Sequence, residues 1–247
     1  HGASDALKKL GRRALVSIPH LRTGSMRGIA PKDRHPAGYL VARPMSAYAE
    51  TYRVLRKAVM QGDGLRSNVV VAITSAVPDE GKTTVALSLA RAAALAGQRV
   101  ALVDCDLRRR NLATLMRLRP ELGLSRAIDD PSSLKDIVLR DPQTEAVLVP
   151  AVAEDSLGGD ILGSPGMAAL IETLRKSFDF VVLDCPPVLA LADAITASVL
   201  ADTTVVVARA DRTPARAIRA AVNQIESAGG FVVGLALNCV QPNVVGR

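Results

Sequence analysis

The stretch between residues 69 and 84 most constrains how this chain can fold, because it combines a strand pattern, a polar loop and a helix start. A continuous apolar run covers 69–73, and an apolar helical pattern begins at Val85. The loop between them ends in Gly81, Lys82, Thr83 and Thr84. In this strand–loop–helix order, Gly-Lys-Thr is typical of a loop that binds phosphate. Backbone amides point toward the anion, and the helix N-terminus adds the positive end of its dipole.

The residues of this loop have separate expected roles. Lys82 is expected to reach the β- and γ-phosphates of a nucleotide, and the Thr83 hydroxyl to bind Mg²⁺. Gly81 occupies the position where the backbone must approach phosphate closely. Ala76 replaces the usual first glycine. The loop residues predicted to bind the nucleotide are Ser75, Pro78, Asp79, Glu80, Gly81, Lys82, Thr83 and Thr84.

Carboxylates follow two further strand-like runs. Asp104 and Asp106 follow the run 99–103, and Asp184 follows the run 180–183. In an open parallel sheet, the carboxyl ends of the strands carry the ligand site. Period-two geometry places Asp104 and Asp106 on the same side of an extended segment, so that one can face a metal and the other a hydroxyl. One such aspartate is usually a turn or cap residue, but three strand ends together predict a nucleotide–Mg²⁺ site.

The remaining pattern predicts one doubly wound α/β domain with a mainly parallel sheet flanked by helices, the P-loop NTPase fold. A chain of 247 residues with 49% hydrophobic content is long and apolar enough for such a core. Strands are expected at 68–74, 99–104, 146–149, 179–184, 203–208 and 231–237. Helices are expected at 45–60, 81–96, 132–140, 165–177, 190–200 and 214–228.

Charge and proline content set the N-terminal part of the chain apart. Residues 1–66 hold 13 Lys or Arg and 4 Asp or Glu, a balance of +9, whereas the whole chain carries +7. We interpret 1–4 as an expression-tag remnant, 5–44 as a basic, poorly regular arm and 45–247 as the folded domain. The arm suits an anionic membrane surface, a nucleic acid or plain solvent. Because the chain has no Trp and 2% aromatic residues, base stacking is disfavoured and no nucleic-acid partner is expected.

The cysteines and the hydropathy of the chain indicate in which cellular compartment the protein is expected. The three cysteines, Cys105, Cys185 and Cys239, are far apart in sequence and form no metal-spaced pair, as is typical of a reducing compartment. No run approaches the length of a transmembrane helix, and no secretory signal is visible. A cytoplasmic location is therefore expected.

The three motifs together resemble the bacterial protein-tyrosine kinases related to the MinD/ParA ATPases. Residues 74–83 resemble the Walker A motif of that family, 103–108 its Walker A′ motif and 182–187 its Walker B motif. The oligomerisation motif of the family, Glu-x-x-Arg-x-x-Arg, is matched by Glu50, Arg53 and Arg56. The ParA and MinD branches usually carry a second, signature lysine in the loop, where this chain has Val77.

The resemblance implies a mechanism. ATP and Mg²⁺ would be the cofactors, with Thr83, Asp106 and Asp184 at the metal. Lys82, Asp104 and Asp106 would be the catalytic residues, with Asp104 orienting or deprotonating the attacking tyrosine hydroxyl. Asn238 would approach the adenine. Arg108 would contact phosphate or hold the acids in place, and the sequence does not decide between the two.

The resemblance also implies partners and a location. Residues 11–19 resemble the juxtamembrane segment that follows a membrane span in fused members of the family, so the arm 5–44 is juxtamembrane-like. The expected partners are further copies of the chain in a ring and a membrane polysaccharide co-polymerase segment, fused upstream or supplied as a separate activator. The expected site of action is the inner face of the bacterial plasma membrane, in exopolysaccharide or capsule synthesis or export.

The tyrosines depart from the family pattern. The usual substrate is a C-terminal tyrosine cluster on a neighbouring subunit, but the tyrosines here are Tyr39, Tyr48 and Tyr52, and 240–247 contains none. The alternative is therefore a non-kinase, ATP-dependent oligomeric switch of the same superfamily. A DNA-partition ATPase is disfavoured by Val77 and by the few aromatic residues.

Overall fold

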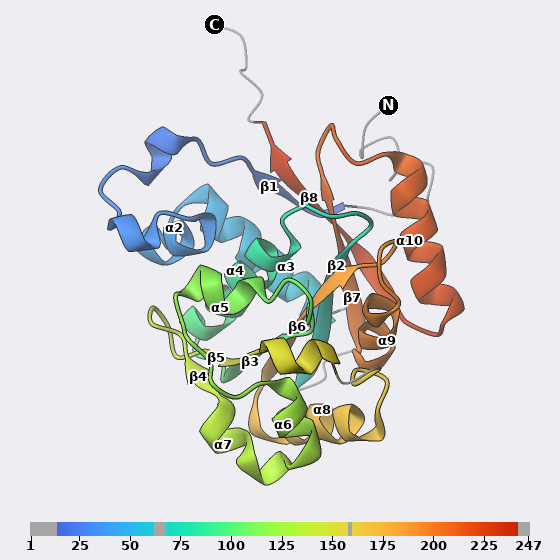
Figure 1. Ribbon diagram of the computed structural model, residues 1–247. Coiled ribbons are helices and arrows are strands. Elements are labelled where there is room, and N and C mark those ends of the chain that lie inside the picture. The colour runs from blue at the N-terminus through green and yellow to red at the C-terminus, as the bar shows by residue number, and fades with distance from the viewer. Residues whose placement is uncertain (1–13, 62–67, 158–159, 242–247) are drawn as a thin grey trace, which may run out of the picture.

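The computed structural model describes residues 14–61, 68–157 and 160–241. Eight strands form one sheet in the order β1-β8-β7-β2-β6-β3-β5-β4, and helices cover both of its faces (Figure 1). The neighbouring strands pair in parallel except β4 with β5. The strands are β1 (Ala14–Pro19), β2 (Val69–Ser75), β3 (Val100–Asp104), β4 (Leu139–Arg140), β5 (Val147–Val149), β6 (Phe180–Pro187), β7 (Thr203–Arg209) and β8 (Val232–Val240).

The connections contain α-helices and short 3₁₀ turns. The α-helices are α2 (Pro36–Ala42), α3 (Ala47–Gln61), α4 (Lys82–Leu95), α5 (Asn111–Met116), α6 (Leu124–Asp129), α7 (Leu134–Ile137), α8 (Pro165–Ser177), α9 (Asp193–Leu200) and α10 (Ala215–Ser227). The 3₁₀ turns are η1 (Thr23–Met26), η2 (Pro31–Asp33), η3 (Pro131–Ser133) and η4 (Ala153–Leu157). The doubly wound, mainly parallel fold predicted from the sequence is confirmed.

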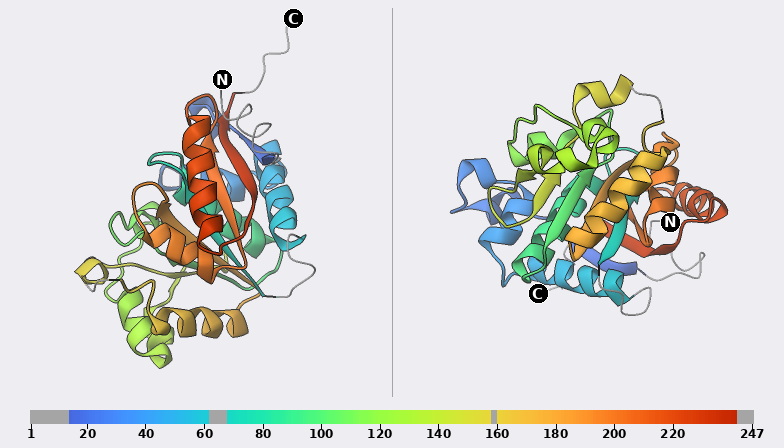
Figure 2. Two further views of the ribbon diagram at one scale, coloured as in Figure 1. Left: turned by 90° about the vertical axis from the view of Figure 1, so that its right-hand side faces the viewer. Right: turned by 90° about the horizontal axis from the view of Figure 1, so that it is seen from below.

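Strand β2 shows why its apolar run is continuous. All seven of its residues are buried, because helices lie over both faces. Val71 and Ile73 contribute to the core beneath α3 and α4, whereas Val70 and Ala72 contribute to the core beneath α8. The left view in Figure 2 shows α10 on one side of the red β8 strand and the cyan helix α3 on the other. The phosphate-loop strand is thus fixed at the centre of the sheet.

The prediction of a poorly regular arm over 5–44 is wrong for two segments. Residues 14–19 form the edge strand β1, which pairs in parallel with β8, and 36–42 form α2, which packs on α4. Val16 and Ile18 are buried on one face of β1, since the edge of β8 offers both backbone partners and apolar contact. The folded domain therefore begins by residue 14. The remnant 1–4 and the rest of the arm up to residue 13 lie outside the described residues.

The prediction of a single helix over 132–140 is also wrong. This stretch divides into η3, the four-residue helix α7 and the short strand β4, which pairs antiparallel with β5. Leu139 pairs with Leu148 of β5, so this end of the stretch forms the edge strand of the sheet and not a helix. The helices α5 and α6 were not predicted, because six residues each are too few to establish a helical period.

Helix α3 begins at Ala47, two residues after the start of the helix predicted over 45–60. Its Ser46 hydroxyl accepts a hydrogen bond of 3.1 Å from the backbone amide of Ala49, which is the N-cap arrangement. Tyr48 and Tyr52 lie on its buried face, with their hydroxyl oxygens 3.2 Å apart. Burial raises the pKa of Tyr48 to about 12. Tyr52 is fully buried, so it is a packed core residue and not an exposed acceptor of phosphate.

None of the helices in the described part of the chain is both long and apolar enough to span a bilayer.

Candidate nucleotide site

The sheet register brings the three predicted motifs to one edge. Asp104 at the end of β3 lies opposite Asp184 in β6, and Asp184 lies opposite Ile73 in β2. The loop after β2 then leads into helix α4. Strands that point in the same direction end at the same edge, so the loop and both acids meet at the carboxyl side of the sheet.

The phosphate loop is held in a conformation that suits an anion. Gly81 has φ +87° and directly precedes α4. A Cβ atom at this position would meet the side-chain nitrogen of Asn238, which would have to move, and the positive φ itself favours glycine. The first amides of α4 have no partner within the helix, and they carry the positive end of its dipole. An anion at this helix start is therefore stabilised.

Lys82 lies between the predicted acids. Its ammonium group donates a hydrogen bond of 2.7 Å to Oδ2 of Asp106, and both side chains are buried. Burial alone would lower the pKa of Lys82, but Asp184 and Asp106 outweigh it, and the pKa is raised. Lys82 is thus charged and is held by a carboxylate at the position predicted for a phosphate contact.

The other two acids have buried oxygen atoms without hydrogen-bond partners among the described residues. These atoms are Oδ2 of Asp104 and both carboxylate oxygens of Asp184. Burial raises the pKa of Asp184 to about 6, against the opposing charge of Lys82. Burial and the neighbouring Asp184 raise the pKa of Asp104 well above its usual value. Buried, unpaired carboxylate oxygens are costly unless a cation or a proton occupies the site.

These unpaired oxygens fit a divalent cation with oxygen ligands. Mg²⁺ binds few protein carboxylates and keeps several waters and phosphate oxygens. The Thr83 hydroxyl lies beside the buried Asp184 carboxylate. Both oxygens of Asp106 already accept hydrogen bonds, one from Lys82 and one from the Arg109 amide at 3.2 Å. Each of these oxygens keeps a second lone pair that can face a metal or a metal-bound water.

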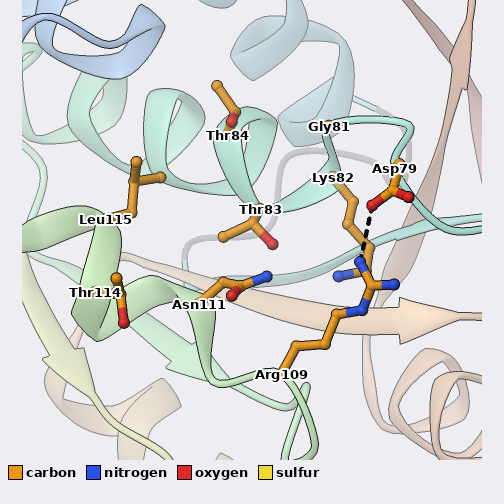
Figure 3. Close-up of a pocket in the computed structure, with 9 residues that line it drawn as sticks. All are labelled: Asp79, Gly81, Lys82, Thr83, Thr84, Arg109, Asn111, Thr114 and Leu115. Atoms are coloured by element: carbon orange, nitrogen blue, oxygen red, sulfur yellow. Dashed lines mark hydrogen bonds and ion pairs between the residues drawn. The ribbon is translucent and has the colours of Figure 1, made fainter.

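A cleft of about 330 Å³ opens over the phosphate loop (Figure 3). Arg109 borders this cleft, and its guanidinium donates a hydrogen bond of 2.9 Å to Oδ1 of Asp79 on the loop. Figure 3 shows this pair as a dashed line beside Lys82. The cleft is lined by Asp79, Gly81, Lys82, Thr83, Thr84, Arg109, Asn111, Thr114 and Leu115.

Two predicted loop residues use their side chains inside the protein. The Glu80 carboxylate is buried and accepts hydrogen bonds of 2.5 and 2.6 Å from the Thr213 hydroxyl and of 3.1 Å from the Arg209 amide. The Ser75 hydroxyl donates to the carbonyl of Val77 at 2.8 Å. These side chains shape the loop, so the groups of Glu80 that remain available to a nucleotide belong to its backbone.

Asn238 lies against the same loop from β8. Its side-chain nitrogen donates a hydrogen bond of 2.8 Å to the carbonyl of Glu80. A second cleft of about 210 Å³ lies here, between the loop and the N-terminal segment. Its lining consists of Pro19, His20, Leu21, Pro36, Tyr48, Asp79, Glu80, Gly81, Thr84, Arg209, Asn238 and Cys239. The residue predicted for adenine contact thus borders a cleft adjoining the phosphate loop.

The three residues predicted for oligomerisation do not act as one group within the chain. Glu50 and Arg53 form an exposed ion pair of 2.6 Å, and Arg53 also donates to the carbonyl of Pro44 at 2.8 Å. Arg56 instead donates to Gln98 at 2.8 Å. Glu50 and Arg53 therefore lie on the surface, while the half-buried Arg56 anchors α3 to the turn after α4.

Sequence analysis missed two partners of the loop. Arg109 directly follows the Walker A′ match and carries the same charge as Lys82, and this charge was its only signal. Thr213 lies 133 residues from Glu80, and no local pattern marked it.

The fold and the site define a class of protein, the P-loop nucleotide-binding α/β proteins. Within that class the chain belongs to the AAA domain family, whose sequence profile matches residues 69–229. The succinoglycan biosynthesis transport protein ExoP of Rhizobium meliloti is 32% identical over 211 residues, which cover 84% of this chain and 27% of ExoP.

Solved structures agree with this assignment. The kinase domain of the Escherichia coli tyrosine kinase ETK has a TM-score of 0.85 at 26% identity, covering 99% of this chain and 97% of that domain. The MinD protein of Pyrococcus horikoshii in complex with Mg-ADP has a TM-score of 0.60 at 22% identity, covering 69% and 70%, and shares the fold. The resemblance to bacterial protein-tyrosine kinases inferred from the three motifs is therefore confirmed.

The chain spans about a quarter of the length of the first curated relatives that it matches, at 27% and 28%.

Proposed function

We propose that this chain binds ATP with Mg²⁺ and transfers the terminal phosphoryl group to a tyrosine hydroxyl of a protein. The observation that carries the proposal is the set of three buried, unpaired oxygens on Asp104 and Asp184 beside the charged Lys82. The similarity to the ETK kinase domain over 99% of the chain supports the same reaction.

Phosphate binding would rearrange the cations of the site. The triphosphate lies along the loop amides at the start of α4, and Lys82 exchanges its carboxylate partner for phosphate oxygens. Asp106, Thr83 and Asp184 would supply the oxygen ligands that hold Mg²⁺. Bound Mg²⁺ would neutralise charge on the phosphates and fix the geometry of the transferred group.

Asp104 is the residue proposed to receive the proton of the tyrosine. Its Oδ1 accepts a hydrogen bond of 3.2 Å from the Asp106 amide, which orients the carboxylate and leaves Oδ2 unpaired. A free tyrosine hydroxyl has a pKa of about 10, so close placement matters more than a matched pKa.

The name of ExoP supports a role in exopolysaccharide synthesis or export for this chain too. We propose that it acts at the inner face of the bacterial plasma membrane, next to a polysaccharide co-polymerase segment, and as a homo-oligomer. The exposed pair of Glu50 and Arg53 supports the oligomer, because its groups are available to a neighbouring subunit. In this proposal the basic stretch before residue 45 meets anionic lipid.

A second candidate is an ATP-dependent oligomeric switch without kinase activity. It is favoured by the burial of Tyr48 and Tyr52, whose hydroxyls are not exposed as phosphate acceptors within this chain. Such a switch binds and hydrolyses ATP and assembles through α3, but it transfers no phosphoryl group to tyrosine.

Phosphotyrosine mapping separates the two candidates. The protein and an Asp104→Asn variant are incubated with ATP, Mg²⁺ and a tyrosine-rich peptide, and the products are analysed by mass spectrometry. The kinase proposal expects labelled tyrosine with the native protein and at least about 100-fold less with the variant. Asp136→Asn, an exposed aspartate on α7, serves as the matched control and should label normally. ATP turnover without any label would refute the kinase and support the switch.

A further inference from the structure

Two cationic side chains border the 330 Å³ cleft, and each is held by a carboxylate. Lys82 is paired with Asp106 at 2.7 Å, and Arg109 is paired with Asp79 at 2.9 Å. The first pair is buried, whereas the side chains of the second are 44% and 73% exposed. A polyanion that enters the cleft therefore meets two positive charges that are already neutralised.

Asp79 brings an exposed carboxylate to the phosphate loop. It lies in the phosphate loop with φ +64°, two residues before Gly81. The hydrogen bond and charge of Arg109 lower the pKa of Asp79, so its carboxylate is ionised at neutral pH. An ionised carboxylate beside a phosphate site repels the ligand unless a cation compensates it. Arg109 provides that compensation in this structure.

The backbone contacts of Arg109 place this residue at the end of the cleft that lies near the acids. Its amide donates hydrogen bonds to the Asp106 carbonyl at 3.1 Å and to the Asp106 carboxylate at 3.2 Å. Arg109 is thus tied to the loop that carries the acids. It does not line the neighbouring cleft at Asn238. Since the acids lie where phosphoryl transfer is proposed, Arg109 belongs to the terminal-phosphate end.

We propose that Arg109 binds the terminal phosphate of ATP and that Asp79 occupies its guanidinium until the nucleotide arrives. This inference rests on the proposed nucleotide site. A guanidinium presents paired N–H groups that match phosphate oxygens as well as a carboxylate. Asp79 therefore stands in for phosphate and competes with it. On binding, Arg109 and Lys82 both exchange a carboxylate for phosphate oxygens.

The competition makes opposite predictions for the two partners of the pair. Arg109→Ala removes a phosphate contact and should weaken ATP binding about tenfold or more, with a smaller loss for ADP, below about threefold. Asp79→Asn removes the competitor and should strengthen ATP binding by about threefold or more. The double variant should bind ATP more tightly than Arg109→Ala alone, because Asp79 without Arg109 is an uncompensated negative charge beside the phosphates.

Isothermal titration calorimetry of the full chain with ATP and ADP, each with Mg²⁺, measures these affinities. The exposed pair of Arg99 and Asp179, 2.6 Å apart at the amino ends of β3 and β6, supplies the matched controls. Arg99→Ala and Asp179→Asn should leave both affinities unchanged.

Two results would overturn the role of Arg109. One is an Arg109→Ala variant that binds ATP as the native chain does. The other is a loss of affinity in Asp79→Asn equal to that in Arg109→Ala, which would mean that the pair only maintains the loop. A native chain that binds no nucleotide would overturn the nucleotide site together with this inference, and the native titration distinguishes that case.

Discussion

The side-chain nitrogen of Asn238 donates a hydrogen bond of 2.8 Å to the carbonyl of Glu80 and lies 2.3 Å from where a Cβ atom of Gly81 would be. One residue of β8 thus holds the phosphate loop, and a side chain at Gly81 would displace its amide group. The close approach explains why the loop is ordered at the point where it has to expose its amides.

Gly81→Ala should therefore abolish measurable ATP binding. The added methyl group meets the Asn238 amide, and alanine at φ +87° is strained by about 1 kcal/mol or more. Nucleotide titration of purified protein measures the loss, and thermal unfolding checks that the fold remains. Adding Asn238→Ala to Gly81→Ala removes the contact but not the backbone strain. That double variant should be more stable than Gly81→Ala, and an equal or lower stability would contradict the proposed contact.

Thr213 should matter to the loop through Glu80. Thr213→Val removes the hydroxyl that donates to the buried Glu80 carboxylate and should cost about 1–3 kcal/mol of unfolding free energy. Thr213→Ser keeps the hydroxyl and should cost clearly less. Urea denaturation compares the two variants. A loss that is as large for serine as for valine would show that the methyl group, and not the hydrogen bond, is the important part of Thr213.

The local part of the site could be predicted from the sequence. Lys82, Asp104 and Asp184 each follow a strand whose apolar residues are contiguous, and the sheet order then brings them together. The pairings of Glu80 with Thr213 and of Arg109 with Asp79 could not be predicted. They depend on how loops that follow separate strands pack against one another. Local hydrophobic patterns and motifs in the sequence carry no information on that packing.

The N-terminal strand shows a second limit. Residues 5–44 contain several prolines and glycines, and this composition predicts an irregular arm. Strand β1 forms nevertheless, since an edge strand needs only one neighbour and β8 supplies it. Tertiary pairing thus overrides local composition in this segment.

The buried pair of Arg91 and Asp141 should be essential to stability. The guanidinium donates hydrogen bonds of 2.9 and 2.7 Å to the two carboxylate oxygens, and both side chains are almost fully buried. Asp141→Leu should cost about 3–5 kcal/mol, because it leaves a buried charge without its partner. Combining it with Arg91→Met should recover much of that loss. Urea denaturation measures both, and a double variant less stable than Asp141→Leu would contradict the pairing. Arg140→Ala, from the exposed pair with Glu145, is the control and should have no measurable effect.

His35 should make stability depend on pH. Its Nδ1 accepts a hydrogen bond of 3.2 Å from the Gly38 amide at the start of α2, and only a neutral ring can accept it there. Burial and the charge of Arg91, together with the weaker influence of Arg117, lower the pKa of His35 below 6.5, against the opposing carboxylates of Asp33 and Asp141.

The sign of that dependence follows from proton uptake. The unfolded chain binds a proton at His35 before the folded chain does, so this contribution to stability is present above about pH 6.5 and is lost as the pH falls through the lowered pKa. His35→Asn keeps an N-cap acceptor without a titrating ring. The native chain should lose more stability between pH 7.5 and pH 5.5 than His35→Asn does, by up to about 1 kcal/mol. Urea denaturation at both pH values measures the difference, and parallel losses in the two proteins would exclude His35 as the source.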